Sequence, residues 1–187
     1  MPRSGPATMA EPDDPPHDLG RLVEVLDRHR VDYLLVGGVA ALAYGANRPT
    51  EDADCVVRRE RSNLDRLAAA LRELDARLRV AGLSDEEARR LPVQIDAAAL
   101  ESAGMTTWMT DAGPFDVLAG LEGADGRLVP YEELVERATV VEGHGVAIRI
   151  AGLDDVIAAK ERASRPKDAE ALPELRALRD HRDNGRP

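Results

Sequence analysis

Apolar side chains recur at helical spacing in four long stretches of this chain and cluster in short runs between them. In the helical stretches they return every three or four positions, which is the pattern of a helix with one buried face. The last two stretches are separated at Arg165-Pro166, because proline interrupts a continuous helix. The pattern predicts helices over residues 18–30, 64–78, 153–163 and 167–178.

The short apolar runs predict strands, since turn-forming residues flank them. Tyr33–Val36 leads directly into Gly37-Gly38, which predicts a buried strand, a tight turn and a short helix over residues 39–44. Further strands are predicted at 52–57, 106–110, 115–118, 139–141 and 146–150, with another short helix at 131–137. Helices at both ends and a small mixed sheet between them predict an α+β, or mixed α/β, fold class.

The two ends of the chain differ in composition from the rest. Residues 1–17 contain five of the 12 prolines and no periodic apolar pattern, so we expect a disordered tail. Residues 179–187 are polar, and we expect a frayed C-terminus. Residues 18–178 then form a single domain of ordinary size.

Charge and cysteine content exclude several classes of protein. The 187 residues include 35 Asp and Glu against 25 Lys and Arg, a formal net charge of −10, which argues against a broad basic surface that coats nucleic acid. A single cysteine excludes an intramolecular disulfide and a cysteine-rich zinc site. No apolar run approaches the roughly 20 residues that a membrane helix needs, and the first residues lack the plan of a signal peptide. We therefore expect a cytoplasmic protein without a membrane partner.

Two acidic residues stand at the start of the strand predicted at 52–57. Asp52 and Asp54 project to the same face of an extended strand. Carboxylates placed in this way raise each other's pKa unless a cation lies between them. A hard divalent cation such as Mg²⁺, bound through carboxylate and phosphate oxygens, suits the pair. The simpler alternative is a solvated strand end with two unrelated aspartates.

Gly37-Gly38 lies between a buried strand and a helix. A glycine pair there lets the backbone approach a bound group closely, and free N–H groups at a helix start can hold phosphate oxygens. Taken alone, the pair is explained more simply by a tight turn without a ligand. Followed by Asp52 and Asp54, it resembles the sequence plan of the polymerase-beta-like nucleotidyltransferase superfamily over residues 33–57. That resemblance implies a third carboxylate on a later strand, for which Asp116 is the candidate and Asp96 the reserve.

The C-terminal helices carry the only two lysines, Lys160 and Lys167. Lys160 falls on the apolar stripe of its helix, where a lysine either extends to water or meets a buried anion. Together with Arg165 and Asp168 these residues place three cations and a carboxylate close together, and such cations suit a triphosphate. The structural alternative is a Lys160–acid pair that links helix and sheet.

These segments together resemble the AbiEii/MenT-type group of minimal nucleotidyltransferases over about residues 20–178. Members of this group are bacterial toxin-like enzymes, usually encoded beside an antitoxin, that transfer a nucleoside monophosphate from an NTP; in MenT-like members the acceptor is the 3′ end of tRNA. The resemblance implies Asp52, Asp54 and Asp116 as catalytic ligands of Mg²⁺ in a two-metal site, with Lys160 as a catalytic cation. The nucleotide-binding residues that it implies are Gly37, Gly38, Arg48, Thr50, Lys160, Arg165, Lys167 and Asp168; Asp168 is either catalytic or fixes Lys160 or Arg165.

The acceptor is the point on which composition and resemblance disagree. A tRNA-modifying enzyme is expected to be basic, whereas this chain is acidic, although a local group of arginines (Arg48, Arg58, Arg59, Arg61) can still hold an RNA 3′ end. A small acceptor such as an aminoglycoside, or a protein hydroxyl, keeps the same chemistry. An inactive nucleotidyltransferase fold that serves as a regulatory module is the third alternative, and the presence of all three carboxylates argues against it. The preferred NTP and the oligomeric state are not encoded in any motif.

Overall fold

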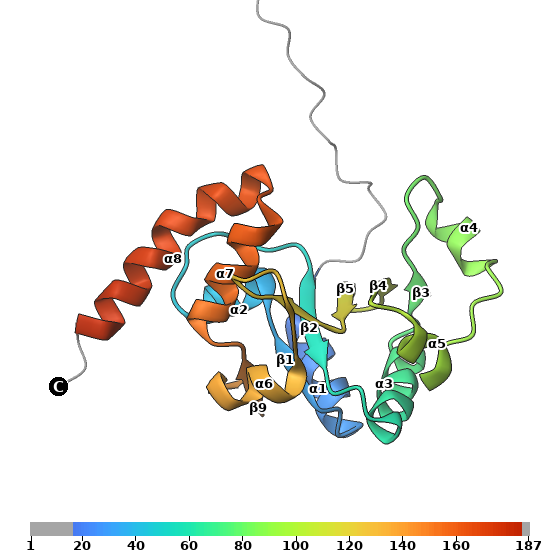
Figure 1. Cartoon of the computed structure of the whole chain (residues 1–187). Coiled ribbons are helices and arrows are strands. Elements are labelled where there is room, and N and C mark those ends of the chain that lie inside the picture. The colour runs from blue at the N-terminus through green and yellow to red at the C-terminus, as the bar shows by residue number, and fades with distance from the viewer. Residues whose placement is uncertain (1–16, 185–187) are drawn as a thin grey trace, which may run out of the picture.

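Strands β2 (Ala53–Val57) and β5 (Gly113–Leu118) lie parallel and side by side in the middle of a seven-stranded sheet. This arrangement comes from a computed structural model, which describes residues 17–184 (Figure 1). The sheet is mixed, because β1 is antiparallel to β2 and parallel to β9. Its order is β3 (Arg77–Leu78), β4 (Met105–Thr110), β5, β2, β1 (Tyr33–Leu35), β9 (Val146–Ile150) and β8 (Thr139–Gly143).

Helices pack against both sides of strands β1 and β2 (Figure 1). Helices α1 (Leu19–Arg28) and α3 (Arg61–Glu73) contact each other on one side, and α2 (Gly37–Ala43) and α7 (Leu153–Ala163) contact each other on the other. Helix α8 (Pro166–Asn184) packs along α7. The core consists mainly of leucine, valine and alanine, with few aromatic side chains. The mixed α/β class predicted from the sequence is confirmed.

Several short elements complete the fold, and the sequence pattern did not predict most of them. Helix α4 (Asp85–Arg89) begins at a capping box in which Ser84 and Glu87 bond to each other's backbone N–H groups. A serine followed three residues later by glutamate is the signal that predicts such a helix start. The remaining elements are α5 (Ala97–Ser102), β6 (Gly120–Glu122), β7 (Leu128–Pro130), α6 (Tyr131–Leu134) and the 3₁₀ helix Val135–Arg137.

The C-terminal helix is longer than its apolar pattern indicated. Helix α8 continues to Asn184, so residues 179–184, which we expected to be frayed, are helical. Contacts outside the apolar stripe accompany this last part: the guanidinium of Arg182 lies 4.9 Å from the centre of the Tyr44 ring, and Arg179 bonds to Asp180. Of the predicted N-terminal tail, residues 1–16 lie outside the described residues. No helix within residues 17–184 is long and apolar enough to cross a membrane.

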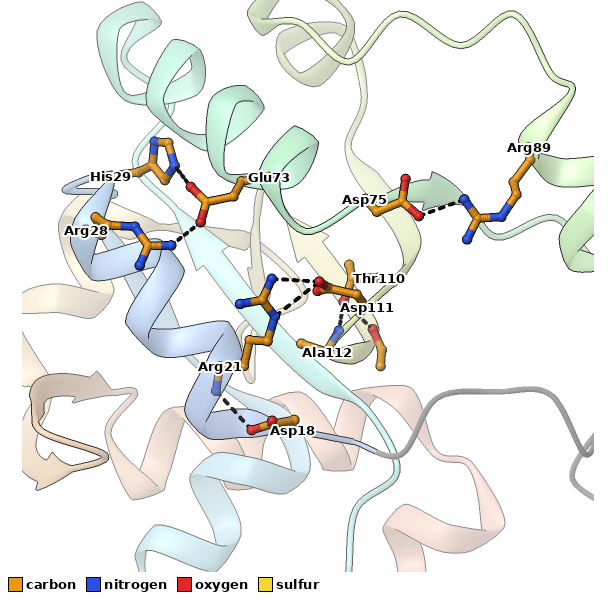
Figure 2. Close-up of polar contacts among 11 residues, drawn as sticks. Asp18, Arg21, Arg28, His29, Glu73, Asp75, Arg89, Thr110, Asp111 and Ala112 are labelled. Atoms are coloured by element: carbon orange, nitrogen blue, oxygen red, sulfur yellow. Dashed lines mark hydrogen bonds and ion pairs between the residues drawn. The ribbon is translucent and has the colours of Figure 1, made fainter.

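Polar contacts fix helix α1 to the turn between β4 and β5 (Figure 2). Arg21 donates two hydrogen bonds to Asp111, of 3.1 and 2.7 Å, and the backbone N–H of Asp18 donates to the Ala112 carbonyl at 2.9 Å. Within the turn, the Thr110 hydroxyl donates to the Gly113 carbonyl and accepts from Ala112. These contacts set the start of β5, three residues before Asp116.

Candidate active site

Three carboxylates gather where β2 and β5 run side by side. Asp54 on β2 is paired in register with Asp116 on β5, and Asp52 stands just before β2. Residues opposite each other on neighbouring strands project to the same face of a sheet. One carboxylate oxygen from each of the three residues lies within 4.8 Å of the others. Asp96, the reserve candidate, is elsewhere: it caps helix α5 by accepting a hydrogen bond of 2.8 Å from the Ala99 N–H.

The environment of these carboxylates is suited to a cation. Burial raises the pKa of Asp54 to about 6, and the charges of Asp52 and Asp116 add to the effect. Burial and the charge of Asp52 also raise the pKa of Asp116. The Oδ1 atom of Asp116 is buried and has no hydrogen-bond partner among the described residues. Because an unpaired buried acceptor is costly, this oxygen is a fitting ligand for a hard divalent cation such as Mg²⁺.

The glycine pair at the start of α2 allows the backbone to approach the carboxylates. Gly37 has a φ of +59°, and a Cβ atom there would overlap the Asp54 carboxylate. At Gly38 a Cβ atom would lie 2.5 Å from the Thr50 hydroxyl oxygen. Thr50 in turn donates to the Asp52 carboxylate at 3.0 Å. The pair is therefore more than a loose turn, since Gly37 lies directly against the Asp54 carboxylate and Gly38 lies against Thr50, which bonds to Asp52.

A buried carboxylate holds two of the predicted cations. The Asp168 side chain is fully buried and accepts hydrogen bonds from Lys160 at 3.0 Å and from Arg165 at 2.6 Å. Burial by itself raises the pKa of Asp168, but the hydrogen bonds from Arg165 and Lys160 outweigh it and leave the pKa below its ordinary value. Asp168 thus fixes both Lys160 and Arg165, which is one of the two roles considered from the sequence.

The other two predicted cations lie in different places. Lys167 is exposed, and its charge lowers the pKa of both Asp54 and Asp116, so it stands near the acidic cluster. Arg48 instead bonds to helix α8, donating to the carboxylate and to the carbonyl of Glu170, each at 3.1 Å. In this structure the Arg48 guanidinium is therefore paired with Glu170 on α8.

A cavity of about 290 Å³ opens beside Asp54. Its polar lining combines two cations, Lys160 and Arg165, with the carboxylates of Asp54 and Glu122, and Gly37 lies beside them. Its apolar side comes from the end of β5, from β6 and β7, and from one face of α7, with Leu118, Leu121, Leu128, Val156 and Ala159. A small molecule with an anionic part and a flat apolar part matches these two sides.

Comparison of the sequence with known protein families agrees with the acidic site described above. Residues 19–181 match the profile of the family described as nucleotidyl transferase AbiEii toxin, type IV toxin–antitoxin system. The chain belongs to this family. It is accordingly a nucleotidyltransferase, an enzyme that transfers a nucleoside monophosphate, and the family expected from the sequence motifs is confirmed. A comparison with curated protein sequences found no match.

Solved structures share the fold of this AbiEii-family chain. The Thermotoga maritima protein TM1012, provisionally assigned as a nucleotidyltransferase, is 17% identical, with 83% of this chain and 88% of that chain covered and a TM-score of 0.50. The lincosamide antibiotic adenylyltransferase LnuA, solved with lincomycin bound, is 10% identical, with 87% and 99% covered and a TM-score of 0.57. At these identities the likeness establishes the nucleotidyltransferase fold.

Three residues that no sequence motif indicated also lie around the site of this AbiEii-family enzyme. Thr107 on β4 is paired in register with Asp116, and the charge of Arg79 lowers the pKa of the Asp116 carboxyl. His17 stands within electrostatic range of Asp52, and its Nε2 atom is buried without a hydrogen-bond partner among the described residues. Their positions depend on strand register and on where α1 begins, so local sequence carries no signal for them.

Proposed function

We propose that this enzyme transfers a nucleoside monophosphate from an NTP to the 3′-terminal hydroxyl of an RNA, with tRNA as the acceptor, and that it acts as the toxin of a toxin–antitoxin pair. The observation that carries the proposal is the cluster of Asp52, Asp54 and Asp116, with a backbone approach at Gly37-Gly38 and two cations beside it. The family supplies the toxin role.

Each group of charged residues in the site has its own role in the proposed transfer. Lys160 and Arg165, held by Asp168, face the cavity and neutralise the triphosphate. The acceptor hydroxyl oxygen forms a bond to the α-phosphorus, the bond from that phosphorus to the bridging oxygen breaks, and pyrophosphate leaves. To Asp116, a member of the acidic cluster, we assign the role of orienting the attacking hydroxyl and taking its proton.

A divalent cation belongs to this proposal. The three carboxylates would hold Mg²⁺, and the unpaired Oδ1 of Asp116 together with the raised pKa of Asp54 supports such an ion at this cluster. When bound, Mg²⁺ supplies charge stabilisation for the reacting phosphate and for the attacking and leaving oxygens.

A second acceptor class has an observation in its favour. The formal net charge of −10 suits a cationic small molecule better than a polyanion, and LnuA, which shares the fold, acts on a lincosamide antibiotic. In that alternative the enzyme would adenylylate, or otherwise nucleotidylate, a hydroxyl of an amino-sugar compound.

A labelling experiment separates the two acceptors. Purified enzyme is incubated with Mg²⁺, each labelled NTP in turn, and either total tRNA or a panel of aminoglycosides and lincosamides. Label in tRNA with a preferred nucleotide is the expected result, and Asp54→Asn removes it. Label in a small molecule and none in tRNA would replace the RNA proposal with the antibiotic one. No transfer to any of them would refute both.

A further inference from the structure

A row of polar residues crosses four strands of the sheet through the acidic cluster. Asp54 on β2 is paired with Asp116 on β5, and Asp116 is paired with Thr107 on β4. One residue beyond β3, the backbone N–H of Arg79 donates to the Thr107 carbonyl at 2.8 Å, which continues the register of β3 with β4. Residues opposite each other across strands project to one face. Arg79, Thr107, Asp116 and Asp54 therefore lie in one line from the sheet edge to the cavity.

Within this row, the Arg79 guanidinium is available to bind an anionic ligand. Its side chain is exposed and makes no hydrogen bond or ion pair with any other residue in the part of the chain that the structure describes. Its backbone is nonetheless fixed by the bond to Thr107. Asp75, before β3, forms an ion pair of 2.7 Å with Arg89 that ties α4 to the end of α3 (Figure 2). The guanidinium is thus carried by a positioned backbone and remains available.

The Asp54 end of the row lies at the cavity proposed for the NTP. On the Asp54 side lie Gly37, Lys160 and Arg165, which line the cavity proposed for the NTP. In a phosphoryl transfer the attacking and leaving oxygens lie roughly in line on opposite sides of the phosphorus. If the leaving pyrophosphate is held at Lys160 and Arg165, the acceptor hydroxyl approaches from the Asp116 side. Arg79 is the cation that lies beyond Asp116 on that side, separated from it by Thr107.

We infer that Arg79 binds a phosphate group of the acceptor, adjacent to the hydroxyl that attacks, so that the site selects an anionic nucleic-acid end over a cationic amino sugar. This inference rests on the proposed nucleotidyl transfer and names the acceptor class for it. A guanidinium pairs with two phosphate oxygens at once, and it repels the ammonium groups of an aminoglycoside. An acidic chain can therefore still bind an anionic acceptor at this point, because the electrostatic field near the reacting hydroxyl matters more than the total charge.

Equilibrium binding tests the inference independently of turnover. The full-length protein is titrated with a fluorescent RNA hairpin that ends in a single-stranded CCA-3′-OH, in the presence of Mg²⁺ and a non-hydrolysable NTP analogue, at several salt concentrations. Arg79→Ala is expected to weaken RNA binding about tenfold. It should also reduce the slope of log Kd against log salt by about 1, the change expected for the loss of one phosphate contact. Arg79→Lys should recover part of the affinity. Binding of the NTP analogue should stay unchanged.

The matched control is Arg149→Ala. Arg149 is an exposed arginine on β9, two strands beyond β2 on the opposite side from β4, so the variant has the same net charge without the position. Equal RNA affinity for the Arg79→Ala and Arg149→Ala variants would overturn the inference, as would tighter binding of kanamycin than of the RNA by the wild type. If RNA binding depends on Arg79 but no tRNA is labelled in the transfer assay, the proposed reaction fails while the assignment of Arg79 stands.

Discussion

Asp54 and Asp116 stand directly opposite each other on two parallel strands, so that the sheet itself brings two negative charges together. Like charges at this spacing oppose folding unless a cation or a proton lies between them. The sheet holds them there with apolar neighbours: Ala53, Cys55, Phe115 and Val117 project to the other face and are buried. The molecule therefore maintains an electrostatically unfavourable cluster by means of its core, which is typical of a site that binds a ligand.

A thermal-shift series tests the metal site without relying on activity. Mg²⁺ should raise the Tm of the wild type, because an ion at a hundredfold excess over its Kd stabilises the native state by about 2.7 kcal/mol. Asp116→Asn should remove most of this shift. Asp96→Asn is the control, since Asp96 caps α5 away from the acidic cluster and asparagine caps as well. Equal Mg²⁺ shifts in the two variants would exclude Asp116 as a ligand.

Gly37→Ala should damage both folding and nucleotide binding. The residue has a φ of +59°, which costs a non-glycine residue about 1–2 kcal/mol, and its Cβ atom would overlap the Asp54 carboxylate. We expect a lower Tm and a loss of affinity for NTP of at least tenfold, measured by calorimetry on the folded variant. In Gly143→Ala the new Cβ atom comes into ordinary contact with Ile148, at 3.5 Å, and binding should be unchanged. Normal NTP affinity in Gly37→Ala would contradict the close approach.

Lys160→Met keeps most of the aliphatic stem and removes the ammonium group that lines the cavity. We expect kcat/KM for the NTP to fall by at least tenfold, which corresponds to about 1.4 kcal/mol of lost transition-state stabilisation. The comparison is Arg176→Met, which breaks the 2.6 Å ion pair with Glu161, an α7–α8 contact outside the cavity. If both variants lose activity equally, Lys160 acts only by joining the two helices.

Asp168→Asn should lower stability at neutral pH by about 2 kcal/mol, because two charge-assisted hydrogen bonds are weakened in a buried position. The folded-state pKa of Asp168 lies below its ordinary value of 3.8, so its contribution is fully present above that value and is lost as the pH falls through the folded-state pKa. The difference between wild type and variant should therefore narrow in acid.

Urea denaturation of both proteins between pH 7 and pH 3 measures this difference. Asp180→Asn serves as the control, since Asp180 is an exposed residue of the same helix that pairs with its neighbour Arg179. Its effect on stability should be small at every pH. A gap between wild type and Asp168→Asn that stays constant down to pH 3 would show that the carboxylate charge does not stabilise the fold.

Much of the molecule follows from patterns that are local in the sequence. Helices α1, α3 and α7 are read from apolar side chains at helical spacing, and β1, β2 and β5 from apolar runs between turns. Residues 77–78, which that spacing placed at the end of a helix over 64–78, form strand β3 instead, and the short elements α5 and β6 were not predicted, because three to six residues carry too little periodicity. Residues 179–184 were assigned to a frayed end, since the Arg182–Tyr44 contact that accompanies their helix joins parts of the chain that only the fold brings together.

The sequence alone determined which chemistry this chain carries: a glycine pair before a helix, an Asp-x-Asp at a strand start, and two lysines near the C-terminus. Tertiary structure decided which of these residues meet. Strand order placed Asp116, and not Asp96, beside Asp54; the buried Asp168 pairs with Lys160 and Arg165; and Arg48 pairs with Glu170 on α8. It also brought Arg79 into line with the carboxylates. The physical reason is that strand register and ion pairing join residues distant in the chain. The local conformational propensity of the sequence contains no information about either.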